Sequence, residues 1–127
     1  MTRLIEVRSY RLKPGALPEL ERLFHKEALP LLQARGIDVV AFGPSPDDPD
    51  AAFLIRAFDD LADRDRREAG LYGSAEWRAG PRESVLACID LYTDTLLTVD
   101  EATVEGLRRV GLEPRPGVEV NGSVADH

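Results

Sequence analysis

Glu6, Arg8 and Tyr10 stand at every second position of the stretch Leu4–Leu12 and are the first candidates for chemistry. Side chains of a β-strand point alternately to its two faces, so this spacing predicts that the three share one face. On that face Arg8 could orient a substrate carbonyl or carboxylate, and Tyr10 could donate a proton. The same groups could instead form a polar network with another strand or a second subunit, because buried polar groups need partners. The residues alone leave both interpretations open.

Arg56 and Phe58 share one parity of a second extended stretch, Ala51–Phe58. Arg56 is interpreted either as an anion-binding group or as the ion-pair partner of Glu6. The second interpretation follows if the two stretches are neighbouring central strands of a split βαβ sheet. Both parities of Ala51–Phe58 are largely apolar, which predicts that both faces of the sheet are covered and favours dimerisation.

His25 lies within the helical stretch Ala16–Arg35. Because histidine titrates near neutral pH, His25 could act as a general base or bind iron near a cavity mouth. It could equally be a partly buried helix residue that bonds a backbone carbonyl. A single histidine makes no metal site, and the other histidine is His127 at the chain end, so we predict neither metal nor cofactor. The candidate catalytic residues are thus Tyr10 and His25, and the candidate substrate-binding residues are Glu6, Arg8, Arg56 and Phe58.

The remaining reactive or aromatic side chains favour structural roles. Trp77 is the only tryptophan, and we interpret it as a packing anchor in preference to a ligand-stacking group. Cys88 has no histidine or basic residue near it in sequence, which indicates an inert small apolar residue. The arginines of Leu61–Ala69 alternate with acids, which favours a solvent-exposed helix face with local ion pairs.

Composition excludes several classes of protein. The 127 residues carry a net charge of −7, which argues against nucleic acid or an anionic membrane as the main partner, since both attract basic surfaces. One cysteine cannot form a disulfide or a cysteine zinc site within one chain. We find no signal-peptide pattern and no apolar run long enough to span a membrane, and we expect a cytoplasmic protein.

The pattern of hydrophobic residues and turn formers predicts a β-α-β order that occurs twice. Pro30 predicts a kink or break near Leu29, Gly36 ends the first helix, and Asp59-Asp60 can cap the second. The expected strands are Leu4–Leu12, Ile37–Phe42, Ala51–Phe58 and Asp90–Val99. The expected helices are Ala16–Arg35, Leu61–Ala69, a helix that starts at Ser74–Trp77, Arg82–Ile89 and a short helix in Asp100–Val110. The order predicts an α+β, ferredoxin-like split βαβ fold with a four-stranded antiparallel sheet. Gly111–His127 is expected to be loose or to lie on a partner.

Four segments in order carry a family resemblance, namely E-V-R-S-Y-R-L-K-P-G (Glu6–Gly15), F-H-K-E-A-L-P-L-L-Q-A-R-G-I (Phe24–Ile37), F-D-D-L-A-D-R-D-R-R (Phe58–Arg67) and Glu76-Trp77. Together they resemble the motifs of the NIPSNAP family, within the dimeric α/β-barrel superfamily, over about Arg3–Val99. The resemblance implies a NIPSNAP-like domain over 1–99 and a C-terminal extension over 100–127. It also implies that one sheet face packs on helices while the other closes against the sheet of a second subunit. On that arrangement Glu6, Arg8 and Tyr10 would face the barrel interior or the partner.

What the resemblance implies about function is a homodimer that binds a small organic molecule. Related branches of the superfamily include cofactor-free monooxygenases, isomerases, dehydratases and haem-degrading proteins. A cofactor-independent enzyme for proton transfer or oxygenation of an activated substrate is therefore one expectation. The alternative is a non-catalytic interaction or scaffold protein, and haem binding through His25 is a weaker third interpretation.

Overall fold

A four-stranded sheet forms the centre of the protein in the computed structural model, which describes residues 2–114. Its strands are β1 (Thr2–Leu12), β2 (Asp38–Pro44), β3 (Ala51–Phe58) and β4 (Ile89–Asp100). They lie in the order β2-β3-β1-β4, and each strand is antiparallel to its neighbours. This order confirms the predicted α+β, ferredoxin-like arrangement, with β1 and β3 side by side in the centre.

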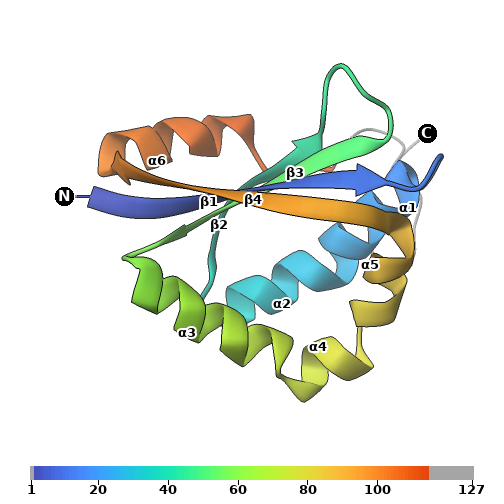
Figure 1. The fold of residues 1–127 in the computed structure, drawn as a ribbon, viewed down its shortest axis with the longest axis horizontal. Helices are drawn as coiled ribbons and strands as arrows, with labels where there is room; N and C mark the ends of the chain where they lie inside the picture. The colour runs from blue at the N-terminus through green and yellow to red at the C-terminus, as the bar shows by residue number, and fades with distance from the viewer. Residues whose placement is uncertain (1, 115–127) are drawn as a thin grey trace.

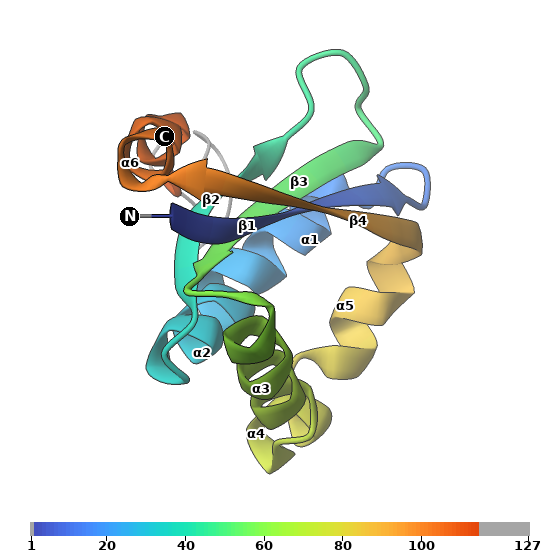
Figure 2. The ribbon, with the colours of Figure 1, turned by 60° about the vertical axis from the view of Figure 1, so that its left-hand side comes forward.

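Helices cover the two sheet faces unequally (Figure 1). One face carries α1 (Leu17–Leu23), α2 (Leu29–Ala34), α3 (Leu61–Tyr72), α4 (Ala75–Ala79) and α5 (Arg82–Cys88). The other face carries α6 (Glu101–Leu107), which a short 3-10 turn, Arg108–Val110, follows. Figure 2 shows α6 on the side of the sheet opposite to α2, α3 and α5. The larger apolar core lies beneath α1–α5, and a smaller one lies beneath α6.

The face of β1 that carries Glu6, Arg8 and Tyr10 points toward α1–α5. Tyr10 and Leu12 of this parity belong to the larger core, whereas Ile5 belongs to the smaller core under α6. The prediction that the polar face turns away from these helices, toward a partner, is therefore wrong. Ion-pair partners on β3, β4 and α3, described below, offset the cost of burying these charged groups among helices.

The first helical stretch does not break before Pro30. A π-helical segment, Phe24–Ala28, joins α1 to α2, and the backbone N–H of Leu29 donates to the carbonyl of Phe24. A proline inside a helix has no N–H and clashes with the carbonyl four residues earlier. The wider π turn accommodates this residue, so the helix is irregular over Phe24–Ala28, beside the predicted kink or break near Leu29, and then continues as α2.

The second helix is longer than predicted. Asp60 caps α3 as expected, since its side chain accepts from the backbone N–H of Asp63. However, α3 runs through Gly70 to Tyr72, where a break after Ala69 was predicted. The tertiary contacts that bury Leu71 completely outweigh the modest cost of one glycine in a helix. This extra turn is important for the site because it carries Tyr72.

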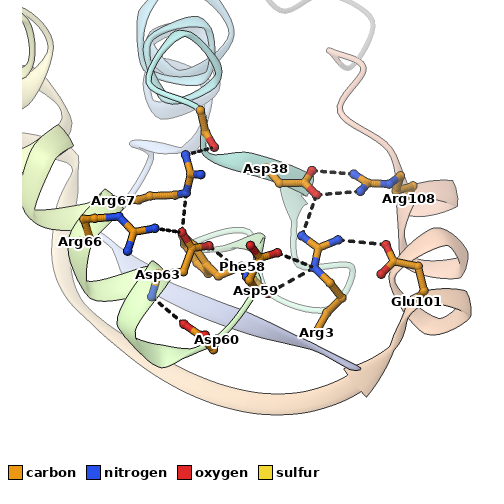
Figure 3. Close-up of polar contacts among 11 residues, drawn as sticks. Arg3, Asp38, Phe58, Asp59, Asp60, Asp63, Arg66, Arg67, Glu101 and Arg108 are labelled. Atoms are coloured by element: carbon orange, nitrogen blue, oxygen red, sulfur yellow. Dashed lines mark hydrogen bonds and ion pairs between the residues drawn. The ribbon is translucent and has the colours of Figure 1, made fainter. Parts of the chain in front are cut away.

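Ion pairs hold α6 on the second sheet face (Figure 3). Asp38 of β2 accepts two hydrogen bonds of 2.8 Å from Arg108, and Arg3 of β1 donates to both Asp38 (3.3 Å) and Glu101 (3.0 Å). Beneath α6, Val104 is fully buried. The predicted short helix in Asp100–Val110 is therefore present and covers part of the face that we had left to a partner.

Two predictions about the C-terminal part stay open. Residues 111–114 are described, and the backbone N–H of Phe42 on the edge strand β2 donates to the carbonyl of Gly111 at 3.2 Å. The rest of the predicted loose tail lies outside the described residues. The division into 1–99 and 100–127 also stays a prediction.

Candidate functional site

A cavity of about 360 Å³ lies between the sheet and the helices that cover its larger core. Its sheet wall consists of Arg8 and Tyr10 from β1, Leu54 from β3 and Tyr92 from β4. The strand register explains this grouping, because Tyr10 lies opposite Tyr92 and Arg8 lies opposite both Leu54 and Asp94.

The helix walls of the cavity are mainly apolar. One wall comes from the π-helical segment and α2, and the other comes from the end of α3, from α4 and α5, and from the start of β4. The first contributes Phe24, Ala28 and Leu32, and the second contributes Tyr72, Trp77, Arg82, Val85, Leu86 and Ile89. A mostly apolar cavity with a few polar groups at fixed places, at the lower end of the usual size range, is typical of a small-molecule site.

Arg8 is the most buried charge in the cavity wall, with 7% of its surface exposed. Its guanidinium donates two hydrogen bonds to Asp94, from Nε to Oδ1 at 2.8 Å and from Nη2 to Oδ2 at 3.0 Å. It also lies 4.2 Å from the ring centroid of Tyr92. Burial works against the charged form, but the hydrogen bonds to Asp94 raise the pKa of Arg8 above its ordinary value. Arg8 is thus a permanent cation held rigidly in one orientation.

The hydroxyl of Tyr72 lies between two guanidinium groups. Its oxygen accepts from Nη1 of Arg8 at 3.2 Å and from Nη1 of Arg56 at 2.8 Å. A phenol oxygen that accepts two N–H groups must direct its own proton away from both. Tyr72 is also one of the residues that line the cavity, and neither guanidinium uses its O–H proton.

A buried ion cluster lies behind Tyr72 and fixes these groups. Glu6 on β1 lies directly opposite Arg56, and Nε of Arg56 donates to its Oε1 at 2.9 Å. The Nη2 group of Arg56 donates to both Glu6 and Glu68. Arg64 of α3 donates to Glu6 at 2.7 Å and lies 3.4 Å from Glu68. The predicted pair of Glu6 and Arg56 is confirmed, and it forms part of this larger cluster.

Burial and neighbouring charges shift the pKa values of the two carboxyl groups of the cluster in opposite directions. Burial, followed by the nearby Glu6, raises the pKa of Glu68 toward neutrality. For Glu6, burial alone would raise the pKa, but the hydrogen bond to Glu68 and the charge of Arg56 lower it below its ordinary value. The pair therefore retains a proton, on Glu68, at a pH where isolated glutamates are ionised.

The structure brings two of the six sequence-predicted site residues to the cavity wall, namely Arg8 and Tyr10. Burial raises the pKa of Tyr10, which makes it a weaker acid than the ordinary phenol that we predicted as proton donor. Glu6 and Arg56 are fully buried in the ion cluster behind the wall, and Phe58 is a buried core residue.

His25 is partly buried on the π-helical segment and does not line this cavity. Its ring contacts Phe42 edge-on, with 5.5 Å between ring centroids. Burial lowers the pKa of His25, against the opposing influence of Glu21 and Glu113. The structure therefore separates His25 from Arg8 and Tyr10, with which it was grouped as a candidate.

Sequence reasoning missed Tyr72, Asp94, Arg64 and Arg82. Asp94 could have been found, because β1 and β4 are neighbours in the predicted fold and Asp94 has the parity that faces Arg8. Arg64 was assigned to a solvent-exposed helix face, since its acidic neighbours in sequence hide the fact that it points toward the sheet. Tyr72 was assigned to a helix break, so its position could not be predicted.

The fold and the cavity define an α+β protein with a ferredoxin-like sheet and a mainly apolar site between the sheet and its helices. Residues 5–99 match the family model of NIPSNAP. The chain belongs to the NIPSNAP family, as the sequence motifs predicted.

Solved structures with the same fold agree with this assignment. A NIPSNAP family protein from Agrobacterium tumefaciens is similar with a TM-score of 0.73 at 17% identity, over 81% of this chain and 90% of that one. A second from the same organism, described as having unknown function, gives 0.71 at 24% identity, over 76% and 87%. A putative antibiotic biosynthesis monooxygenase from Nitrosomonas europaea gives 0.53 at 12% identity, over 75% and 88%. Among curated proteins there is no match.

Two kinds of feature are absent from residues 2–114. No helix in this range is long and apolar enough to cross a membrane. Within the same range, no three His, Cys, Asp or Glu side chains are grouped so that they could hold a metal ion.

Proposed function

We propose that this protein binds a small organic molecule in the cavity and holds an oxygen atom of that molecule at Tyr72. The observation that carries the proposal is the position of Tyr72, which lines the cavity and whose hydroxyl oxygen accepts from Arg8 and Arg56, so that its own proton is left for a bound molecule. The apolar walls favour a ligand with an aromatic or aliphatic body. Tyr72 replaces Tyr10 as the main donor, and Arg8 fixes its orientation.

The same arrangement supports catalysis as a second candidate function. Two guanidinium groups beside a phenol would stabilise negative charge that develops on a substrate oxygen, or on Tyr72 itself after it gives up its proton. Proton transfer to, or oxygenation of, an activated substrate without a cofactor fits such a site. The Nitrosomonas europaea protein, named a putative monooxygenase, has the same fold at low identity, which is compatible with this chemistry.

We further propose that the protein is a homodimer. The part of the second sheet face beyond α6 has a hollow lined by Ser9, Arg11, Phe53, Leu91 and Thr93, among others, and 57% of the surface of Leu91 is exposed. A second copy on this face would bury these side chains, as in the barrel that the family resemblance implies. A non-catalytic scaffold is the less favoured alternative, because that role would not explain a cavity with a fixed hydrogen-bond donor in its wall.

The proposal predicts that Tyr72→Phe weakens binding of a ligand that carries a hydroxyl group. Trp77, the only tryptophan, lines the cavity, so its emission can report binding directly. Phloretamide and hydrocinnamide form a neutral probe pair that differs by one hydroxyl. We expect the wild-type protein to bind phloretamide about tenfold more tightly, a factor that corresponds to one hydrogen bond, and Tyr72→Phe to remove this preference.

Tyr92→Phe is the matched control, because Tyr92 lines the same cavity and its side chain is half exposed. This variant should retain the preference for phloretamide. Equal binding of the two probes by the wild-type protein would contradict the role of Tyr72, and failure to bind either would contradict the proposed function.

A further inference from the structure

Arg82 is a cation of the cavity wall that has no acidic partner among residues 2–114. It is the first residue of α5 and is exposed to solvent, and within residues 2–114 it makes no ion pair. By contrast, the other arginine of the wall, Arg8, forms a two-bonded pair with Asp94. The charge of Arg82 is thus available to a molecule that enters the cavity.

The electrostatic setting of the cavity is unusual for this chain. The protein carries a net charge of −7, yet none of the described residues that line the cavity is an aspartate or a glutamate. In and behind the wall, the three arginines Arg8, Arg56 and Arg64 pair with Glu6, Glu68 and Asp94, and these acids offset most of the positive charge, or all of it once Glu68 is ionised. Arg82 lies outside this balance and gives the site an excess of positive charge.

From this placement we infer that the ligand is an amphipathic organic anion, whose carboxylate or similar group binds Arg82 at the rim of the cavity. Its apolar body would lie against Trp77 and Val85, and a second oxygen would reach Tyr72 at the buried end. A guanidinium binds a carboxylate through two parallel hydrogen bonds, which makes a planar carboxylate a suitable partner. This inference rests on the proposed function and adds the chemical class of the ligand.

The test compares acids with their neutral amides. Three matched pairs serve as probes: benzoate with benzamide, hydrocinnamate with hydrocinnamide, and phloretate with phloretamide. Binding is followed by Trp77 emission in the wild-type protein, Arg82→Gln, Arg82→Lys and the control Arg78→Gln. Arg78 is an exposed arginine on the neighbouring helix α4, without an ion pair in the described chain and outside the cavity wall.

We expect the wild-type protein to bind the acid of at least one pair about tenfold more tightly than the amide, and added salt to reduce this preference. Arg82→Gln should abolish the preference, Arg82→Lys should retain part of it, and Arg78→Gln should leave it unchanged. Equal binding of acids and amides by the wild-type protein would overturn the inference while the proposed function stands. A preference for acids that survives in Arg82→Gln would overturn the role of Arg82. If no probe binds, both the inference and the proposed function fail.

Discussion

Two glutamates from distant parts of the chain share the same two guanidinium groups. Glu6 of β1 and Glu68 of α3 both contact Arg56 and Arg64, although the sequence separates the two glutamates widely. Two carboxylates in a poorly solvated place repel each other, so one of them binds a proton more readily than it would in water. In this pair Glu68, which lies on the solvent side, is the group with the raised pKa.

Replacement of Glu68 by glutamine is expected to remove a pH dependence of stability. Burial and Glu6 raise the pKa of Glu68 to about 7, from 4.5 in the unfolded chain. Between these two values the folded state binds the proton more tightly than the unfolded state, so the free energy of unfolding falls as the pH rises through this window. We expect the wild-type protein to lose about 2 kcal/mol between pH 5 and 8, measured by urea unfolding, and Glu68→Gln to lose much less.

The exposed Glu83→Gln serves as the control, and it should follow the wild-type curve. His25, whose pKa burial lowers, is common to all three proteins, so the difference between their curves isolates Glu68. The pKa of Glu6 is lowered, so its contribution is lost only at more acidic pH. Parallel curves for the wild-type protein and Glu68→Gln would contradict the proton assignment.

At the scale of elements, β1 separates two different environments. Its even-numbered residues face the cavity and the ion cluster, and its odd-numbered residues face α6 or the open part of the sheet. The helix α6 lies on this second face with Val104 fully buried over Ile5 and its neighbours. The helix α6 (Glu101–Leu107) is therefore a layer of the fold.

Val104→Ala is expected to lower the free energy of unfolding by about 2 kcal/mol, because it removes two buried methyl groups from the smaller core. Val110→Ala is the control, since 58% of its surface is exposed, and it should change stability by less than about 0.5 kcal/mol. Denaturant unfolding of both variants checks this. If Val104→Ala lowered the free energy of unfolding as little as Val110→Ala, α6 would not unfold together with the rest of the protein.

At the scale of the whole molecule, part of the second sheet face beyond α6 is left without cover. Leu91 and Leu97 of β4 expose 57% and 46% of their surfaces. An antiparallel sheet can leave one face to solvent, but apolar side chains on that face favour association. The proposed homodimer would cover this region, and β4 would then lie within the interface.

Leu91→Arg is expected to convert the proposed dimer into a monomer, because it would place a charge among the apolar side chains of the interface. Leu61→Arg is the matched control, since Leu61 is similarly exposed, at 52%, but lies at the start of α3. Sedimentation velocity distinguishes the two species. A wild-type monomer at micromolar concentrations would contradict the homodimer, as would a Leu91→Arg variant that stays dimeric.

Much of the fold could be predicted because it depends on local patterns. Alternation in Leu4–Leu12 predicted a strand with three polar groups on one face, and turn residues placed most of the boundaries. The known strand order of the split βαβ fold then predicted that Glu6 pairs with Arg56, which the structure confirms. Helix ends were less predictable where packing outweighs propensity, as at Gly70 in α3.

The sequence by itself determined the strand order, the family and the common face of Glu6, Arg8 and Tyr10. Only the tertiary structure decided which layer that face meets, because alternation fixes that residues share a face but not what covers it. It also decided that Tyr72 from α3 and Arg82 from α5 lie around one cavity, and that Arg64 from α3 joins the ion cluster behind it. Long-range packing sets such juxtapositions, and side chains far apart in sequence leave no periodic signal of their contact.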